Sequence, residues 1–337
     1  MDKKNAICFS NPAHIGDVWL SVPFVRKICE ENPDIIFYFF SIIGHAFFDN
    51  ISNLKNLQDH VSQNYDISLN NLQAPELHVN IPNELKRHLL NTGIGSVNEV
   101  SILNYNNTNI ICLNTWCGSK SNYTQTYKVD SVDANIKFYS QKIKNMINVT
   151  NAILKLKNST INIKYSQSLG KYDYLPKIDA NVDISEFNNW LKKNKEKKKI
   201  FIYNFMGRCN FVKKDFNNDI LELSKKKDII IIVSSYYHGL KNIENIKFCD
   251  KDFKCNYTPS CYNLLQIARI AEQCESIVTL PTGGAWGFYN CNMNVKDKKY
   301  YMFRGRCYTD KLNNWYNFNS QSNDNPIKNI YSLDKLL

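Results

Sequence analysis

A carboxylate near the start of the chain stands where a general base could work. Asp17 follows Gly16 in the segment that joins a short apolar run, Ala6–Ser10, to a helical pattern. A glycine in that turn lets the backbone come close to a ligand. The aspartate could then accept the proton of a substrate hydroxyl as that hydroxyl acts as a nucleophile. The structural alternative is that Asp17 caps the helix, which is a common role for an aspartate in this place.

Histidine and tryptophan side chains near predicted strand ends are candidates for binding the acceptor. His14 stands two residues before Gly16 and could orient the acceptor or the aspartate, and His45 is a second histidine of this kind. Trp116 and Trp19 could stack on the face of a sugar. The alternatives are a structural histidine and a partly buried core tryptophan. We predict an acceptor site that includes His14, Gly16 and Trp116.

A glycine loop in the second half of the chain has the features of a phosphate site. Thr282, Gly283 and Gly284 follow a strand-like run, Ser276–Leu280, and precede a predicted helix. Free backbone N–H groups and the positive end of a helix attract an anion, so we expect a donor phosphate to bind there. The alternative is an ordinary glycine turn.

Basic side chains follow the first predicted strand of the second half. Arg208 comes after Ile200–Phe205, and Lys213 lies close behind. Either could neutralise a leaving diphosphate, a task that a metal performs in other sites, and no metal site is predicted here. Both could equally be plain surface charges. Arg304 and Arg306 are similar candidates with a weaker case.

Two motifs together resemble one protein family. The run Gly16, Asp17, Leu20, Pro23, Pro33, Asp34 resembles the opening of the ADP-heptose:lipopolysaccharide heptosyltransferases (glycosyltransferase family 9), which are inverting enzymes of the GT-B fold. The helical segment Leu264–Ala271, the strand after it and the residues Pro281–Trp286 resemble that family's helix, strand and aspartate-threonine-glycine loop. The resemblance implies that Asp17 is the catalytic base and that the Thr282 loop binds the donor diphosphate.

The second motif departs from the family at two positions. Pro281 stands where the family has aspartate, and Trp286 stands where it has histidine. These departures imply either a nucleotide or sugar other than that of ADP-heptose or a loss of activity.

The rest of the sequence alternates strand-like and helix-like patterns. A helix after Ser10 carries Val18, Val22, Val25 and Cys29 at helical spacing, and Pro23 within it predicts a kink or a later start. Further predicted strands are Ile35–Ile43, Leu77–Ile81, Asn109–Asn114, Ile229–Ser234, Ile246–Cys249 and Tyr300–Phe303. Further predicted helices are Pro82–Leu90, Ile136–Leu156, Phe216–Leu223, one after Pro259 with Ser260 as N-cap, and Ser332–Leu337.

This order predicts an α/β fold, GT-B-like, with two Rossmann-like domains that face each other across a central cleft. The polar, lysine-rich stretch Ser166–Lys199 marks the junction, and its lysines from Lys192 onward are predicted to form a solvated linker. We place an acceptor-binding domain at residues 1–180 and a nucleotide-sugar-binding domain at residues 181–337.

The amino-acid composition limits the kinds of partner, metal and cellular location that we expect. The formal charge is +11, but lysine, asparagine and isoleucine are all abundant, as AT-rich codons produce, and no dense basic tract interleaved with aromatics appears. We therefore predict no nucleic-acid partner. The 11 cysteines form no CxxC pair, so neither a zinc site nor a disulfide framework is indicated. No signal segment or transmembrane helix is predicted, and a cytoplasmic location, with peripheral membrane association left open, fits a reducing environment.

Taken together, the sequence predicts a metal-independent, inverting glycosyltransferase with Asp17 as its base and no cofactor. Its partners are a nucleotide-sugar donor and a glycan or glycolipid acceptor. The alternative is a catalytically degenerate GT-B protein that binds a nucleotide-sugar or a glycan. A nucleic-acid-binding protein would rest on charge alone, and a single-domain epimerase would need a GxGxxG motif that residues 11–16 do not supply.

Overall fold

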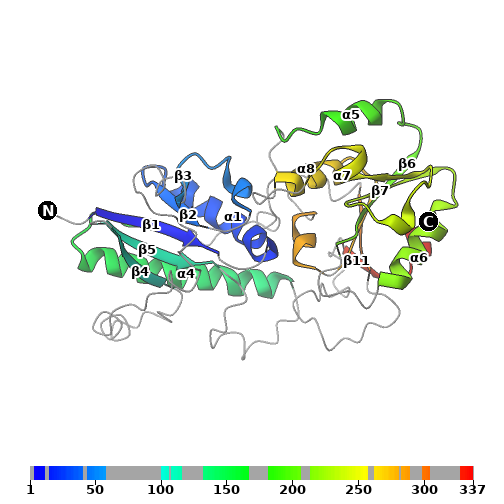
Figure 1. Ribbon diagram of the computed structural model, residues 1–337. Helices are drawn as coiled ribbons and strands as arrows, with labels where there is room; N and C mark the ends of the chain where they lie inside the picture. Colours follow the sequence, from blue (N-terminus) through cyan, green and yellow to red (C-terminus); the bar gives the residue numbers. More distant parts are fainter. Residues whose placement is uncertain are drawn as a thin grey trace. The chain divides into compact units, whose positions relative to one another are not determined.

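The chain forms two compact units, each built on its own β-sheet with helices beside it (Figure 1). The computed structural model describes residues 4–11, 15–40, 44–57, 100–105, 108–115, 132–166, 181–205, 213–256, 262–280, 282–288, 298–303 and 327–336. The first unit is Met1–Tyr127 with Asp133–Tyr174, and the second is Lys128–Val132 with Leu175–Leu337. Both sheets are mainly parallel, which confirms the predicted α/β class.

The first sheet has the strand order β3-β2-β1-β5-β4. All its pairings are parallel except that of β4 with β5. Its elements are β1 (Lys4–Ser10), α1 (Ile15–Glu31), β2 (Phe37–Phe40), the 3-10 turn η1 (His45–Phe48), β3 (Leu54–Asn56), β4 (Val100–Tyr105), β5 (Thr108–Asn114) and α4 (Val132–Leu156).

Helix α1 contains a proline in its interior and continues beyond it. It runs from Ile15 to Glu31 with Pro23 inside, so of the two predicted alternatives, a kink and a later start, the later start is excluded. A proline in a helix interior costs about 3 kcal/mol. The predicted stripe Val18, Val22, Val25, Cys29 is almost fully buried, and each such apolar side chain contributes roughly 1.5–3 kcal/mol. The free energy gained by burying the stripe therefore exceeds the free-energy cost of the proline. Ring contact between Phe24 and Tyr139, with centroids 4.6 Å apart, packs α1 on α4.

The second sheet has the order β11-β10-β9-β6-β7-β8, and all its described pairings are parallel. Its elements are α5 (Ser185–Lys192), β6 (Lys198–Tyr203), α6 (Lys213–Ser224), β7 (Ile229–Val233), η6 (His238–Leu240), β8 (Ile246–Phe248), α7 (Cys249–Asp252), α8 (Tyr262–Ala271), β9 (Ser276–Thr279), η7 (Gly283–Phe288), β10 (Lys299–Phe303), β11 (Ile327–Ile330) and η10 (Leu333–Leu336).

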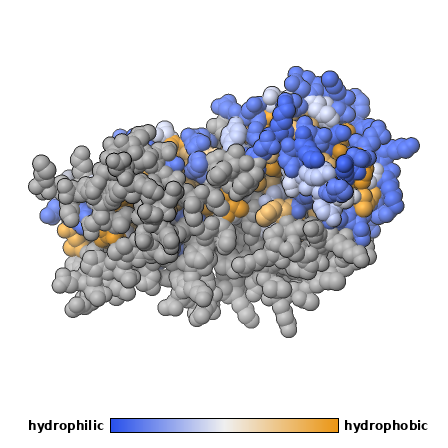
Figure 2. All heavy atoms as spheres, in the orientation of Figure 1, coloured by the Kyte–Doolittle hydropathy of each residue, from blue (hydrophilic) through white to orange (hydrophobic). Residues whose placement is uncertain are grey.

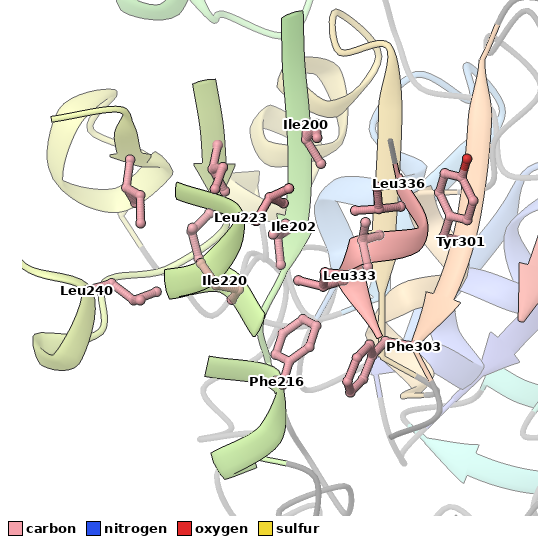
Figure 3. Close-up of a cluster of buried hydrophobic side chains, with 14 of the residues drawn as sticks. Ile200, Ile202, Phe216, Ile220, Leu223, Leu240, Tyr301, Phe303, Leu333 and Leu336 are labelled. Atoms are coloured by element: carbon pink, nitrogen blue, oxygen red, sulfur yellow. The ribbon is translucent and has the colours of Figure 1, made fainter. Parts of the chain in front are cut away.

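A hydrophobic core holds α6, η10 and the second sheet together (Figure 3). Phe216 of α6 and Phe303 of β10 meet with ring centroids 4.8 Å apart. The backbone N–H of Leu333 donates to Asp219 Oδ2 at 2.9 Å, which fixes η10 on α6. Every residue of β7 is buried, as expected for a central parallel strand.

Several predicted elements differ from those observed. Strand β2 begins at Phe37 instead of Ile35, because the Ile35 N–H bonds to Asn32 O in a turn. The predicted terminal helix Ser332–Leu337 is observed as the 3-10 turn η10, Leu333–Leu336. Strands β3, β4 and β11 were not predicted. The predicted strand Leu77–Ile81, helix Pro82–Leu90 and N-cap Ser260 lie outside the described residues.

The predicted junction contains structure. Helix α5 lies within it, and its Phe187 packs edge-on against Phe253 with centroids 5.1 Å apart. Lys199 is not part of a solvated linker, because it lies in β6 and is only 3% exposed. Its ammonium donates to the carbonyls of Lys195, at 3.0 Å, and Lys197. These two bonds compensate the burial of the charge.

The visible face of the second unit carries mostly hydrophilic side chains (Figure 2). Of the helices that the structure describes, none combines the length and the apolar composition needed to cross a membrane.

Candidate ligand sites at the carboxyl ends of the strands

The first sheet reverses its strand order beside β1. The chain passes from β1 to β2 on one side, whereas β5 pairs with β1 on the other, with Ser10 opposite Asn114. Loops that leave neighbouring strands at such a switch point diverge and form a crevice, which is where open α/β sheets bind ligands. The segments after β1 and after β5 therefore define the candidate site of the first unit.

The predicted acceptor residues lie in those two segments. Gly16 and Asp17 belong to the first turn of α1, so Gly16 is not in a free turn and Asp17 is not the N-cap. The reason is that α1 begins earlier than its apolar pattern suggested, at Ile15. His14, Trp116 and the side chain of Asp17 lie outside the described residues. Trp19 is a core residue, stacked on Phe47 with ring centroids 4.4 Å apart, as the structural alternative had it.

Hydrogen bonds fasten the strand ends around this site. Thr115 donates to the Ser10 carbonyl through its N–H, at 2.9 Å, and through its hydroxyl, at 3.2 Å. The Tyr139 hydroxyl donates in turn to the Thr115 carbonyl. The Asn11 N–H donates to Phe40 O at 3.0 Å. The ends of β1, β2 and β5 thus form one cross-linked rim.

Asn11 is the residue of this rim that sequence reasoning missed. It is 0% exposed, and neither its amide oxygen nor its amide nitrogen has a hydrogen-bond partner among the described residues. A buried unpaired polar group costs about 1–3 kcal/mol, so it calls for an explanation. A polar residue directly after the first strand was the available signal.

The second sheet reverses between β6 and β9, where Tyr203 lies opposite Thr279. The segment after β6, which contains Arg208, and the segment after β9, which contains Thr282, therefore leave neighbouring strand ends. Arg208 lies outside the described residues. Lys213 is the first residue of α6, whereas we had expected it in the loop.

Thr282 is buried and has an unused hydroxyl. Its side chain is 6% exposed, and Oγ1 has no hydrogen-bond partner among the described residues. Its backbone is engaged on both sides, because its N–H donates to Leu280 O at 2.7 Å and its carbonyl accepts from Ala285 N at 3.0 Å. The backbone of Thr282 is thus held on both sides, whereas its buried hydroxyl has no partner among the described residues.

The loop after Thr282 forms a 3-10 turn, η7, instead of the predicted α-helix. Two successive glycines, Gly283 and Gly284, disfavour an α-helix, and the segment has only six residues. The end of η7 is anchored on the sheet, since the Phe288 ring packs on Tyr203 with centroids 4.5 Å apart. Contributions from a helix dipole are therefore small here, and the Thr282 hydroxyl and backbone groups carry the case for an anion.

A single amide ties the ends of β6 and β7 together. Asn204 Oδ1 accepts from Ser234 Oγ at 2.7 Å, Ser235 Oγ at 3.0 Å and Ser235 N at 3.1 Å, and its Nδ2 donates to Ser235 O at 2.9 Å. These bonds occupy the amide oxygen and one of the two Nδ2 hydrogens, so the role of Asn204 is to position the two loops.

The sequence contains one Asp-x-Asp triplet, Asp250–Asp252, a motif that often binds a metal. We missed it when we predicted no metal site. In the structure both carboxylates hold backbone amides. Asp250 Oδ2 accepts from Tyr236 N at 2.9 Å, and Asp252 Oδ2 accepts from Phe248 N at 2.6 Å. Among the described residues, no three side chains of the histidine, cysteine, aspartate or glutamate type come together to hold a metal.

Burial raises the pKa values of two cysteine thiols, those of Cys29 and Cys255. Burial raises the pKa of Cys29 to about 12, and burial together with the charge of Asp250 does the same for Cys255. Such thiols are poor nucleophiles. They give no support to cysteine catalysis at either site.

Comparison with known proteins finds a weak structural likeness and no match in sequence. No protein-family model matches the chain, and no curated protein sequence matches it. Among solved structures, the E. coli heptosyltransferase WaaC with ADP has a TM-score of 0.44 and 11% identity, covering 97% of this chain and 90% of that chain. A glycosyl transferase family 9 structure from Veillonella parvula has a TM-score of 0.42 and 10% identity, with 90% and 81% covered.

The NodZ alpha-1,6-fucosyltransferase soaked with GDP-fucose is also similar, with a TM-score of 0.37 and 10% identity over 85% of this chain and 91% of that chain. Scores and identities this low do not by themselves establish a shared fold. The assignment of function therefore rests on the residues of this chain.

Proposed function

We propose that the protein is a glycosyltransferase that moves a sugar from a nucleoside-diphosphate sugar to a hydroxyl of a glycan or glycolipid. The observation that carries the proposal is the buried hydroxyl of Thr282 at the switch point of the second sheet, which has no hydrogen-bond partner in the described part of the chain. It stands in the loop that, by resemblance to the heptosyltransferases, binds the donor diphosphate. The first unit would bind the acceptor.

The proposed reaction is a displacement at the anomeric carbon. Asp17 accepts the proton of the acceptor hydroxyl as its oxygen attacks, and the bond from the anomeric carbon to the diphosphate breaks on the opposite face, so the configuration inverts. The Thr282 hydroxyl, the backbone N–H groups of Gly283 and Gly284, and Arg208 or Lys213 stabilise the negative charge that develops on the diphosphate. Because both carboxylates of the Asp-x-Asp triplet hold backbone amides, we propose that these protein groups replace a metal.

The donor half of the proposal is tested by ligand binding. We expect one of ADP, GDP, UDP or CDP to raise the melting temperature, because a ligand that binds only the folded protein stabilises it. The isosteric substitution Thr282→Val should weaken that nucleotide about tenfold. Thr150→Val is the matched control, since Thr150 is also buried with an unpaired hydroxyl but lies on α4 of the first unit. Equal effects of both substitutions would refute a specific role for Thr282.

The catalytic half is tested separately. Asp17→Asn should lower transfer by roughly 10²–10⁴-fold, the usual contribution of a general base, and leave the nucleotide affinity unchanged. Transfer at the unaltered rate would remove Asp17 from the mechanism.

A binding protein without transferase activity is the second candidate. The observation in its favour is that Pro281 and Trp286 occupy positions where the resembled family carries aspartate and histidine. Under this alternative, a nucleotide would still stabilise the protein, but no donor would be consumed. Donor hydrolysis or transfer, followed by mass spectrometry, separates the two.

A further inference from the structure

The first unit contains a cavity beside the end of α4, away from the candidate acceptor site. Its volume is about 320 Å³, close to the lower end of the range for small-molecule pockets. One wall is the last turns of α4, from Asn151 to Lys155, and the other is the segment Ser159–Asn162. Tyr139, which reaches the rim of the acceptor site, stands 16 residues before Lys155 on α4, or about 24 Å along the helix axis. The cavity is therefore a separate site.

Hydrogen bonds hold the second wall of the cavity in place. The Asn151 amide binds both backbone groups of Ile163, because its Oδ1 accepts from the N–H at 2.8 Å and its Nδ2 donates to the carbonyl at 2.9 Å. The Asn32 amide, beside the end of α1, does the same for Lys164, with both bonds at 2.8 Å. The chain that forms the wall is thus fixed before a ligand arrives. A ligand then avoids the entropic cost of ordering it.

The carbonyl groups at the end of α4 are already occupied. The Ser159 N–H donates to Leu154 O at 2.9 Å, and the Lys157 N–H donates to Ile153 O at 3.1 Å. A left-handed φ of 55° at Asn158 lets the chain turn in this way. These bonds reduce the negative charge that a helix end presents to an anion beside it.

The groups that line the cavity suit an acidic sugar. Of the described residues in the lining, Lys155 alone is charged. Thr160 and Asn162 are exposed and supply a hydroxyl and an amide, which donate and accept hydrogen bonds as sugar hydroxyls do. Ala152 and Ile161 add apolar surface for the C–H groups of a sugar ring.

The charge around the cavity is positive. Residues 136–166 include six lysines and no aspartate or glutamate. The carboxylate that bonds to this stretch belongs to Glu31, and it is engaged by the Lys27 ammonium at 3.3 Å and by the Ser166 N–H at 2.8 Å. The surroundings therefore attract an anionic ligand in preference to a neutral one.

We propose that this cavity binds an acidic sugar, with its carboxylate or phosphate on the Lys155 ammonium and its hydroxyls on Thr160 and Asn162. The sugar is either a free molecule or a unit of the acceptor glycan. Only the second source rests on the proposed function.

The experiment is a titration followed by saturation-transfer difference NMR, which measures weak binding. The probes are glucuronic acid and glucose 6-phosphate, with neutral glucose for comparison. At least one acidic sugar should bind about ten- to a hundredfold more tightly than glucose, as expected for a hydrogen bond between charged groups. Lys155→Gln should remove this preference, and so should Asn162→Asp, which places a like charge in the wall. Both residues are exposed, so the variants should fold normally.

Lys144→Gln is the matched control, because Lys144 lies on the same helix outside the described lining of the cavity. It should keep the preference for the acidic sugar. Equal affinity of the unaltered protein for acidic and neutral sugars would overturn the inference, as would no binding of any of them. Binding that survives both Lys155→Gln and Asn162→Asp would place the sugar elsewhere and would also overturn it.

The proposed function is tested apart from this cavity, because the nucleotide is detected by its effect on the melting temperature. Lys155→Gln should leave that effect unchanged. A higher KM for the acceptor in Lys155→Gln, at unchanged kcat, would identify the glycan as the source of the acidic sugar, and an unchanged KM would identify a free sugar. If no nucleotide binds, the proposed function fails, and the titration alone decides the inference about the cavity.

Discussion

Two buried asparagines of the first unit should respond to truncation with opposite signs. Asn11 is 0% exposed and its amide has no partner among the described residues. Asn53 is 9% exposed, and its Nδ2 donates to the carbonyls of Cys29, Asn32 and Ile35 at 2.9–3.0 Å. The two positions match in residue type, burial and unit, but differ in hydrogen bonding.

The magnitudes follow from these contacts. Asn11→Ala removes an unpaired amide that costs about 1–3 kcal/mol, and part of that gain is lost to reduced packing, so we expect a net gain of about 1 kcal/mol. For a unit of this size the gain corresponds to a rise of roughly 2–4 °C in melting temperature. Asn53→Ala deletes the Nδ2 group, whose two hydrogens are shared among three carbonyls, and at about 1 kcal/mol per hydrogen it should lose about 2 kcal/mol.

The assay is urea unfolding of both variants beside the unaltered protein, followed by circular dichroism and tryptophan fluorescence. If Asn11→Ala loses stability as Asn53→Ala does, the amide of Asn11 has a hydrogen-bond partner within the protein. The amide is then not available to a ligand, and the reasoning is refuted. If it gains stability but lowers glycosyl transfer, the residue is retained for binding.

Three further predictions concern stability and reactivity. Ile231→Ala, in the buried centre of β7, should lower the free energy of unfolding by about 2–5 kcal/mol in urea titrations. Burial alone would raise the pKa of Glu31, but hydrogen bonds from Ser166 lower it below its ordinary value. The stability from that carboxylate is therefore present above the pKa of the unfolded chain and is lost as pH falls through the lower folded pKa, so the acid loss of stability should be smaller in Glu31→Gln. Cys29 and Cys255, with pKa values of about 12, should resist a thiol reagent at pH 8 in the folded protein and react rapidly in urea, as peptide mass spectrometry can check.

The elements that sequence patterns predicted best are those decided by local composition. Strand β7 is a continuous run of four isoleucines and a valine, and α8 shows its buried stripe at helical spacing. Strand β11 carries Lys328 and Asn329 between its isoleucines, so its alternation is too short to stand out. Helix α5 lay hidden among lysines, since only Phe187 and Trp190 mark its buried side.

At the candidate sites, too, the sequence revealed the features that depend on neighbouring residues and missed those that depend on distant ones. The Thr282 loop was found because glycines after an apolar strand are a local signal. Asn11, Asn204 and Asp250 were missed, because what distinguishes them is the presence or absence of a partner elsewhere in the chain. Asn204 bonds to residues 30 and 31 positions away, and Asp250 to one 14 positions away. Only the folded sheet brings such pairs together.

The short strands at the borders of the sheets bear on how the protein behaves in concentrated solution. In the described sheets, β3 and β8 each have three residues and β11 has four. A strand from another molecule would find few backbone groups to pair with at these borders, and such shortness is a recognised protection against aggregation. The fourth border strand, β4, belongs to the first sheet and is longer, with six residues paired antiparallel to β5. The protein can therefore keep strongly apolar central strands such as β7 without offering them a route to fibrils.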